Sequence, residues 1–423
     1  MTFKDLGVIP EILKSLEAKG YTHPTPIQEQ AIPFLLKKRD LLGCAQTGTG
    51  KTAAFTIPIL QHLANDHQNH KGPRKIKALI VTPTRELAIQ IADNITEYSS
   101  NLPIKNTVIF GGVKPHIQKR VLSNGVDVLV ATPGRLLDLA NQGFISFKDI
   151  EYFVLDEADQ MLDMGFIHDI KRILKKLPER RQSLFFSATM PKSIVELSGQ
   201  ILGNPHKITI KPEQATAERV GQSIYFVSKK QKINLLIHLM HERDPASVLV
   251  FSRTKYGADK IVKKLDRANI RAAAIHGNKS QNARQRALGA FKDGKINVLI
   301  ATDIAARGID VSELELVINY DLPNVPETYV HRIGRTGRAA ASGEAISFCM
   351  GDERPYLKDI QKLIKQTLPV VEDHPYPDDG SDDVPTEPKP QQRKQLKKPQ
   401  SKRGPRGGGA GNKDKKRWNR GRR

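Results

Sequence analysis

Short apolar runs that alternate with longer helical stretches restrict the fold of this chain more than any other feature. These runs lie at residues 77–83, 126–133, 152–159, 183–189, 247–254, 296–303 and 314–321. Their apolar residues are consecutive, as in strands that are buried on both faces of a parallel sheet. The series occurs twice in a similar order, and VLVATPGR at 128–135 is matched by VLIATDIAARG at 298–308. We therefore predict an α/β protein with two similar parallel-sheet domains; convergent strand composition is the alternative.

Polar and charged stretches set the expected domain boundaries. The segment KPEQATAERVG at 211–221 has the composition of an interdomain linker. The prediction is a first domain, a linker, a second domain, an acidic Pro-rich linker and a basic tail, at residues 1–210, 211–220, 221–370, 371–388 and 389–423. The tail holds 15 basic residues and one acidic residue, so it carries +14 of the formal net charge of +22. Its repeated Arg-Gly pairs and low complexity predict disorder.

The composition excludes several classes of protein. Two cysteines, Cys44 and Cys349, are too few for a disulfide framework or a multi-cysteine zinc site, and they fit a reducing compartment. No apolar run approaches the roughly 18 residues of a membrane span, and Lys4 and Asp5 stand where a signal peptide needs apolar residues. We expect a cytoplasmic protein with no membrane partner. The basic excess favours a polyanionic partner, although charge alone does not separate nucleic acid from an acidic membrane surface.

The segment at 45–52 has the pattern of a phosphate-binding loop between a strand and a helix. Gly48 and Gly50 allow backbone N–H groups to turn toward phosphate oxygens. Lys51 would reach the β- and γ-phosphates, and the Thr52 hydroxyl would ligate Mg²⁺. The general pattern has glycine where this chain has Ala45, so a glycine-rich turn before a helix is the alternative. The predicted nucleotide-binding residues of the loop are Ala45, Gln46, Thr47, Gly48, Thr49, Gly50, Lys51 and Thr52.

A second acidic element strengthens this prediction. In VLDEAD at 154–159, an apolar run delivers Asp156 and Glu157 to the carboxyl end of a strand, where ligands of parallel sheets bind. Asp156 suits an Mg²⁺ site, partly through water, and Glu157 could orient or deprotonate an attacking water. An acidic helix start is the alternative. The combination with the phosphate loop favours a catalytic role.

These two motifs together resemble the DEAD-box RNA helicases. Further motifs of that family follow in the same order: PTRELA at 83–88, GG at 111–112, TPGR at 132–135, SAT at 187–189, ATDIAARGID at 301–310 and HRIGRTGR at 331–338. The resemblance covers roughly residues 1–370 and is closest to the bacterial RhlE-type branch. It implies two RecA-like domains, with ATP in the cleft between them and RNA across both.

The resemblance also implies roles for single residues around ATP. Gln28, at the end of GYTHPTPIQ, would bind adenine through its amide, and Phe3 would stack near the base. A helix-capping Gln28 and a buried Phe3 are the alternatives. Asp310 resembles the residue that holds the ribose. Arg335 and Arg338 would act as arginine fingers, and with Lys51, Asp156 and Glu157 they complete the implied catalytic set. A solvated helix end or an RNA contact is the alternative for these two arginines.

Two further groups of residues are implied by the family. His331 would couple with Ser187 and Thr189, and Asp159 would belong to the same coupling. The implied RNA contacts are Thr84, Arg85, Gly112, Thr132, Arg135, Arg253, Gly277 and Thr302. Small hydroxyls, glycine N–H groups and arginines suit phosphate and sugar, which carry no base sequence. Because aromatic residues make up only 6% of the chain and Trp418 lies in the tail, we expect no base-stacking platform in the folded core.

The predicted function is that of an ATP-dependent RNA helicase. It would use ATP and Mg²⁺, hydrolyse ATP in an RNA-stimulated way, and separate short RNA duplexes or remodel ribonucleoprotein as a monomer. Preference for RNA over DNA follows from the resemblance alone. Ribosome-assembly and RNA-degradation machineries are candidate partners. The alternatives are an ATP-switched RNA clamp or chaperone that unwinds little, and a small-molecule phosphotransferase built on the same loop.

Overall fold

The computed structural model of the chain describes residues 1–46, 48–67, 72–210, 220–306, 309, 311, 314–337 and 343–378. The chain divides into two compact units, Met1–Asp383 and Val384–Arg423, and every described residue belongs to the first unit. The predicted basic tail at 389–423 and residues 211–219 of the predicted interdomain linker lie outside the described residues.

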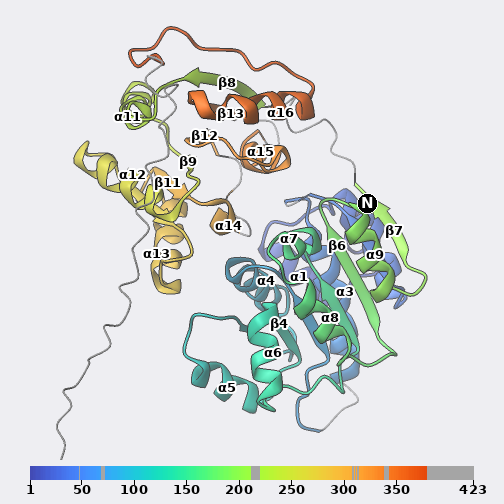
Figure 1. Cartoon of the computed structure of the whole chain (residues 1–423). Helices are drawn as coiled ribbons and strands as arrows, with labels where there is room; N and C mark the ends of the chain where they lie inside the picture. Colours follow the sequence, from blue (N-terminus) through green and yellow to red (C-terminus); the bar gives the residue numbers. More distant parts are fainter. Residues whose placement is uncertain are drawn as a thin grey trace, which may run out of the picture. The chain divides into compact units, whose positions relative to one another are not determined.

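The first half of the chain forms a parallel sheet in the order β3-β4-β2-β5-β6-β1-β7 (Figure 1). Its strands are β1 (Leu41–Cys44), β2 (Ala78–Val81), β3 (Asn106–Ile109), β4 (Val128–Ala131), β5 (Tyr152–Leu155), β6 (Gln182–Ser187) and β7 (His206–Thr209). Every residue of β2, β4, β5 and β6 is buried, which is the property that the consecutive apolar runs predicted. The predicted strands therefore occupy the centre of the sheet.

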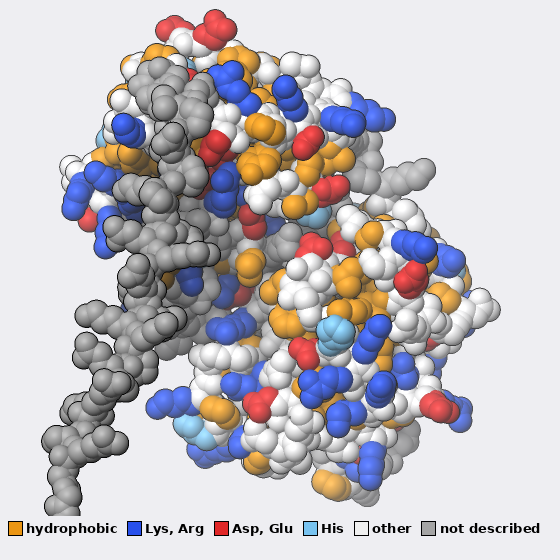
Figure 2. All heavy atoms as spheres, in the orientation of Figure 1, with side chains coloured by type: hydrophobic (Ala, Val, Ile, Leu, Met, Phe, Trp, Pro, Cys, Tyr) orange, Lys and Arg blue, Asp and Glu red, His pale blue; other side chains and the backbone are white. Residues whose placement is uncertain are grey.

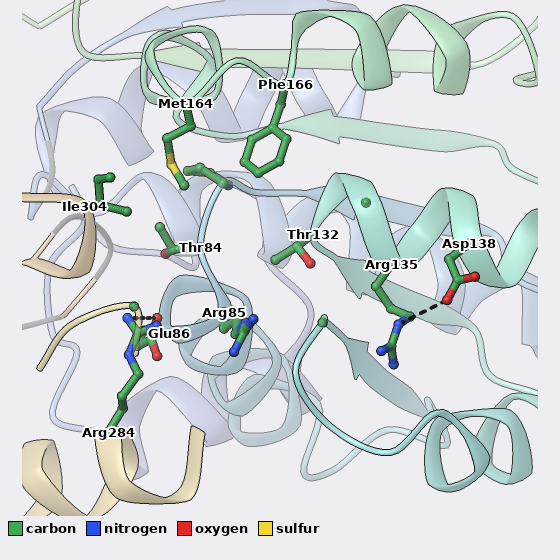
Figure 3. A pocket seen from close by; sticks show the side chains of 14 residues that line it. Thr84, Arg85, Glu86, Thr132, Arg135, Asp138, Met164, Phe166, Arg284 and Ile304 are labelled. Atoms are coloured by element: carbon green, nitrogen blue, oxygen red, sulfur yellow. Dashed lines mark hydrogen bonds and ion pairs between the residues drawn. The ribbon is translucent and has the colours of Figure 1, made fainter. Parts of the chain in front are cut away.

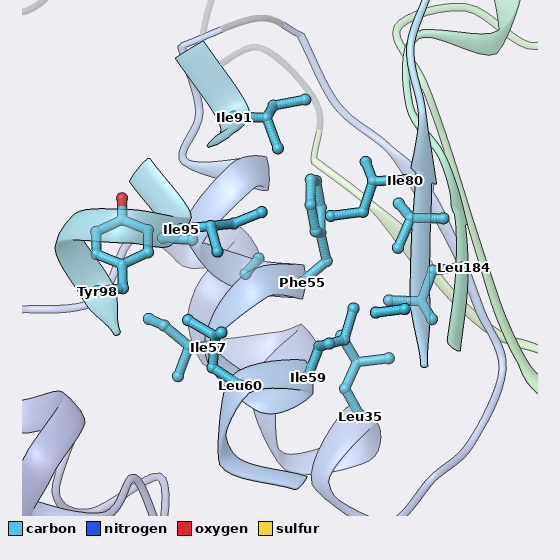
Figure 4. Packing of buried hydrophobic residues seen from close by; sticks show 14 of the residues in the cluster. Leu35, Phe55, Ile57, Ile59, Leu60, Ile80, Ile91, Ile95, Tyr98 and Leu184 are labelled. Atoms are coloured by element: carbon cyan, nitrogen blue, oxygen red, sulfur yellow. The ribbon is translucent and has the colours of Figure 1, made fainter. Parts of the chain in front are cut away.

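Helices pack on both faces of this sheet. They are α1 (Pro10–Ala18), α2 (Pro26–Leu36), α3 (Lys51–His67), α4 (Arg85–Tyr98), α5 (Pro115–Ser123), α6 (Pro133–Asn141), α7 (Ala158–Asp163), α8 (Ile167–Leu174) and α9 (Lys192–Ile201). Because neighbouring strand residues point to opposite faces, Ile80 packs with Phe55 and Ile91 in one core, and Leu79 belongs to the other. Figure 4 shows the first of these cores.

The second half repeats the architecture with a parallel sheet in the order β10-β11-β9-β12-β13-β8. Its strands are β8 (Val220–Phe226), β9 (Val248–Phe251), β10 (Ala272–Ile275), β11 (Val298–Ala301), β12 (Leu316–Asn319) and β13 (Gly343–Cys349). Its helices are α11 (Lys232–Arg243), α12 (Lys255–Arg267), α13 (Gln281–Lys292), α14 (Asp303–Ala306), α15 (Pro326–Ile333), the 3₁₀ turn η1 (Gly351–Glu353) and α16 (Arg354–Ile364). Two apolar cores cover the two faces of this sheet. The prediction of two parallel-sheet α/β domains is confirmed.

The chain that follows α16 continues along the edge strand β8. Ile224 donates a backbone hydrogen bond to Pro369 (2.9 Å), and Val371 donates one back to Ile224 (2.9 Å). The His374 ring lies 5.3 Å from the Tyr225 ring. The segment predicted as an acidic linker is described as far as Asp378, and in this part it covers a sheet edge that would otherwise have unpaired backbone groups.

The surface of the described part mixes both signs of charge. On the face shown in Figure 2, Lys and Arg side chains are interspersed with Asp and Glu. No helix among the described residues is long and apolar enough to span a membrane.

Candidate functional site

The phosphate loop connects β1 to α3 and is shaped by its glycines. Gly48 and Gly50 have φ angles of +85° and +93°, which glycine adopts without strain. A Cβ atom at Gly50 would lie 2.4 Å from Nε2 of Gln28, so only glycine fits there. Lys51 is buried, and its ammonium donates a hydrogen bond to the carbonyl oxygen of Ala45 (2.8 Å). The backbone of the loop thus holds the Lys51 ammonium on the inner side of the loop. Thr47 lies outside the described residues.

Gln28 fastens this loop to helix α2. Its Oε1 accepts from the backbone N–H of Thr25 (2.9 Å), and its Nε2 donates to the carbonyl oxygen of Gly50 (3.1 Å). The Thr25 hydroxyl donates to the carbonyl oxygen of Thr49 (2.8 Å). Gln28 therefore occupies position N3 of α2 in a capping box whose N-cap is Thr25. This is the helix-capping alternative that the sequence raised. Phe3 is 3% exposed and belongs to the first core, in line with the buried alternative for that residue.

The two acidic residues predicted after β5 are both buried. The Glu157 N–H donates to Oδ1 of Asp156 (3.0 Å), and Glu157 has a left-handed backbone with φ of +55°. Such a conformation costs about 1–2 kcal/mol for a residue other than glycine, so the surrounding fold must impose it. Burial raises the pKa of Asp156 above its ordinary value.

The pKa of Glu157 is higher than that of an ordinary glutamate. Burial and, next, the negative charge of Asp156 raise the pKa of Glu157 to about 7, whereas the positive charges of Lys51 and Arg335 act in the opposite direction. A general base is most effective when its pKa lies near the working pH. The buried Asp156 carboxylate and the Thr52 hydroxyl are hard oxygen donors, and this donor set fits Mg²⁺.

Asp159 joins the DEAD segment to the SAT segment. Its Oδ2 accepts hydrogen bonds from the backbone N–H groups of Ala188 (3.1 Å) and Thr189 (2.8 Å) and from the Thr189 hydroxyl (2.9 Å). The Ser187 hydroxyl donates to the Thr189 carbonyl oxygen (2.8 Å). A displacement of Asp159 in α7 would therefore be transmitted directly to the residues that follow β6.

The arginine-rich motif, HRIGRTGR at 331–338, begins in the last turn of α15. Arg335 is 8% exposed and donates to the carbonyl oxygen of Ile309 (2.9 Å). His331 lines a small cavity together with Arg335 and Asp303. The structure does not test the predicted coupling of His331 to the SAT segment. Arg338 and Asp310 lie outside the described residues.

Arg332 was not among the predicted residues, yet it makes several hydrogen bonds inside the second half of the chain. It donates two hydrogen bonds to the Asp303 carboxylate (2.6 and 2.8 Å), one to Oδ1 of Asn319 (3.1 Å) and one to the carbonyl oxygen of Asp321 (2.7 Å). These bonds connect α15 to α14 and to the end of β12. The position of Arg332 three residues after Tyr329 and directly before Ile333, both of them buried, was the signal that could have indicated a buried role.

The predicted RNA-binding residues of the first sheet gather around one pocket of about 450 Å³ (Figure 3). Thr84 and Thr132 begin α4 and α6, and Arg85 and Arg135 follow them in those helices. Gly277, from the loop after β10, also lines the pocket. The pocket therefore brings together hydroxyls, guanidinium groups and an exposed backbone, which suit the phosphates and sugars of a strand.

The two predicted arginines of the pocket, Arg85 and Arg135, are held in place. Arg135 donates to Oε1 of Gln118 (3.1 Å) and to the carbonyl oxygen of Val113 (3.2 Å). The Arg85 guanidinium lies directly against Gly112. A Cβ atom added at that glycine would be 2.3 Å from Nη1 of Arg85. Gly112 has a φ angle of +81°, so both its backbone and its neighbour exclude a side chain.

Three polar residues of the pocket region were missed by the sequence analysis. Glu86 accepts from Nε2 of Gln281 (2.8 Å) and from Nη2 of Arg284 (2.9 Å), and all three side chains are buried. Gln281 and Arg284 are three residues apart at the start of α13, so they lie on one face of that helix. This spacing was visible in the sequence, but the partner, Glu86, lies almost 200 positions away. The missed apolar residues of the pocket are Met164, Phe166 and Ile304.

Two predicted RNA contacts of the second half lie elsewhere. Arg253 is exposed, and its guanidinium donates to Oε1 of Glu353 (2.6 Å) and to the carbonyl oxygen of Leu322 (3.1 Å). Thr302 donates its N–H to the carbonyl oxygen of Ile275 (3.4 Å). Among the described residues, neither of the two belongs to the pocket lining.

Comparisons with known proteins agree over most of the chain. Residues 25–197 match the family model DEAD/DEAH box helicase, and residues 231–340 match the model Helicase conserved C-terminal domain. The ATP-dependent RNA helicase CshA of Listeria monocytogenes is 42% identical over 366 residues, which are 86% of this chain and 69% of that protein. The ATP-dependent RNA helicase DeaD of Escherichia coli is 42% identical over 372 residues, which are 88% of this chain and 58% of that protein.

A solved structure shows the same arrangement of the fold. Dbp5 of S. cerevisiae, in a structure bound to RNA and ADP BeF3, is similar with a TM-score of 0.76 and 32% sequence identity, over 90% of this chain and 97% of that chain. These comparisons do not test the resemblance to the RhlE-type branch, which stays a prediction.

Proposed function

The chain belongs to the DEAD/DEAH box helicase family, and from this premise we propose that it works as an ATP-dependent RNA helicase. It hydrolyses ATP in an RNA-stimulated way and locally separates short RNA duplexes or remodels ribonucleoprotein. The observation that carries the proposal is the buried Glu157: burial and the negative charge of Asp156 raise its pKa to about 7, and the positive charges of Lys51 and Arg335 act in the opposite direction. Residues from the phosphate loop, the DEAD segment and the arginine motif thus act on one proton acceptor.

The chemistry follows from the placement of these side chains. Lys51, at the start of α3, would bind the β- and γ-phosphates of ATP, and Glu157 would accept a proton from the attacking water. Arg335 would offset the negative charge that develops in the transition state. Mg²⁺, when bound, would be held by Asp156 and Thr52 and would offset the charge of the phosphates. Gln28, Phe3 and Asp310 remain proposed contacts of the nucleoside.

RNA would bind in the pocket described above. Contacts to phosphate and sugar make the binding independent of sequence. The bonds from Asp159 to Thr189 and from Glu86 to Arg284 are the proposed paths by which bound RNA and bound ATP influence one another. Strand separation would then accompany a closure that ATP and RNA favour together.

Partners and location are further parts of the proposal. We infer a monomeric, cytoplasmic protein from the composition and the low cysteine content. Ribosome-assembly or RNA-degradation machineries are the candidate partners. The basic tail would act as a tether that raises the local concentration of RNA.

ATP hydrolysis measured with and without structured RNA tests the proposal. We expect stimulation by RNA in the full chain, and its loss in Glu157→Gln, in which no carboxylate can take the proton. Unstimulated hydrolysis would favour a small-molecule phosphotransferase, and stimulated hydrolysis without separation of a short duplex would favour the RNA clamp. Near-normal turnover in Glu157→Gln would remove Glu157 as the base.

A further inference from the structure

The outer face of helix α12 presents one aromatic residue followed by three cations. Tyr256, Lys260, Lys263 and Arg267 recur at helical spacing and therefore lie on one face of the helix. All four are exposed, and Tyr256 is 72% exposed. The opposite face, with Ala258, Ile261 and Leu265, is buried in the core of the second half. Figure 2 shows Lys and Arg side chains along the edge where Figure 1 places α12.

The beginning of α12 is fastened to the loop that carries Gly277. Lys255 donates to Oδ1 of Asn278 (2.9 Å). Oδ1 of Asp259 lies 2.8 Å from Nζ of Lys279 and 3.0 Å from Nε2 of the buried His276. Gly277 lines the pocket proposed for RNA. The first turns of α12 therefore lie next to the loop that carries Gly277, within the same half of the molecule.

The chemistry of this face fits a nucleic-acid strand. Asp259 is occupied by Lys279 and His276, so the cations of the outer face are not neutralised by it. The Lys255 ammonium lies 5.5 Å from the centroid of the Tyr256 ring, and among the described residues no other aromatic ring pairs with Tyr256. An exposed ring stacks on unpaired bases of any identity, and a basic row follows their phosphates. A protein partner would be expected to need a wider apolar surface than one ring.

We propose that the outer face of α12 binds a single-stranded extension of the RNA, with a base stacked on Tyr256 and phosphates along Lys260, Lys263 and Arg267. The inference rests on the proposed function, and it amends the expectation from composition that the folded core has no stacking residue. The row from Tyr256 to Arg267 spans roughly 16 Å, or about five nucleotides of a stacked strand.

The test compares two RNAs on the full chain in the presence of a non-hydrolysable ATP analogue. One is an oligouridylate that is just long enough to stimulate hydrolysis, and the other is the same oligonucleotide extended at either end by about five adenylates. Fluorescence anisotropy gives the two affinities. We expect wild type to bind the extended RNA more tightly, and Tyr256→Ala to lose about tenfold in affinity for the extended RNA alone. Tyr256→Phe should retain the wild-type affinity, because the ring is what stacks.

The cations are tested through the salt dependence of binding. Replacing Lys260, Lys263 and Arg267 by Gln should lower the salt slope by about 2 on the extended RNA. The control replaces the equally exposed Lys358, Lys362 and Lys365 at the end of the chain's second half, and its slope should be unchanged. Three results would each overturn the proposal. They are equal affinity of wild type for the two RNAs, an affinity of Tyr256→Ala for the extended RNA that equals that of wild type, and an equal loss of affinity for both RNAs in Tyr256→Ala. If RNA fails to stimulate hydrolysis by wild type, the proposed function itself fails, which is a different result.

Discussion

Glu157 combines a strained backbone, full burial and a raised pKa in one residue. The fold holds its φ at +55° and buries its carboxyl group within range of the negative charge of Asp156, and both features work against stability. Functional sites commonly keep such strain because it positions a reactive group. The catalytic role proposed for Glu157 therefore predicts a measurable stability cost.

That cost depends on pH, and Glu157→Gln should reveal it. A carboxyl group whose pKa is raised from 4.5 to about 7 by folding binds protons more tightly in the native state. Its stabilising contribution is complete below the unfolded pKa and is lost as pH rises through about 7. Glu157→Gln has no carboxyl group at this position and so does not lose stability as the pH rises. Its free energy of unfolding should exceed that of wild type by on the order of 1–3 kcal/mol at pH 8 and by little at pH 5. Thermal unfolding of the nucleotide-free protein in EDTA measures this difference, and an equal gain at both pH values would contradict it.

Sequence analysis located the strands and the phosphate loop from local patterns. The pocket residues Thr84, Arg85 and Arg135 were implied by the family resemblance, and their contacts were not predicted. Gln28 shows what was missing: its spacing from Thr25 indicates a capping box, but the bond to Gly50 exists only because the fold brings the loop to α2. The RNA contact of Arg253 stays a prediction, but its bond to Glu353, 100 residues further along the chain, could not be predicted from local spacing. Such pairings depend on tertiary structure, which local spacing does not encode.

At the scale of elements, the loop between β3 and α5 must lie directly against helix α4. Gly112→Ala would place a Cβ 2.3 Å from Nη1 of Arg85 and would strain the backbone as well. We expect Arg85 to be displaced and RNA affinity to fall about tenfold, the value of one charge-assisted hydrogen bond. The neighbouring Gly111→Ala is the comparison and should lose less affinity, because its Cβ would meet Nη2 of Arg85 at an ordinary 3.8 Å, although Gly111 itself lines the pocket. Equal effects of the two substitutions on RNA binding would refute the role of this contact.

The turn η1 carries a buried charge that connects three elements. Glu353 accepts from Lys232 of α11 (2.7 Å) and from Arg253 after β9 (2.6 Å), and Lys232 is itself only 1% exposed. Glu353→Gln would leave the buried ammonium with Asp321 alone, at 3.4 Å. We expect a loss of about 3 kcal/mol in the free energy of unfolding.

Urea unfolding measures this loss. Glu327→Gln, at the exposed start of α15, is the control and should change stability by less than about 0.5 kcal/mol. Exchange of both partners, as Lys232→Met with Glu353→Gln, should recover part of the loss, because no unpaired charge then remains buried. A double variant that is less stable than Glu353→Gln would argue against this explanation.

At the scale of the whole molecule, the charge is divided between the folded part and the tail. The tail carries +14 of the +22, and single-stranded RNA binds such a segment through the release of counterions. Deletion of residues 389–423 should weaken RNA binding and flatten its salt dependence, while hydrolysis at saturating RNA stays near the wild-type rate. An unchanged salt slope would exclude the tether.

The contact of Glu86 with Gln281 and Arg284 connects the two halves of the chain through a single carboxylate. Glu86 and Arg284 are both mostly buried and form an ion pair with an N–O distance of 2.9 Å. Glu86→Gln keeps the shape and one hydrogen-bond acceptor but removes the charge. If this contact carries the coupling between RNA and ATP, the variant should bind each ligand alone as wild type does. The increase in ATP affinity that RNA causes should be about five- to tenfold smaller in the variant than in wild type.

The comparison requires ATP-analogue affinities with and without saturating RNA. By reciprocity, RNA affinities with and without the analogue should show the same deficit. A uniform loss of RNA affinity that is independent of nucleotide would instead identify Glu86 as an ordinary part of the pocket wall, and the connection between the halves would have to be carried by other residues.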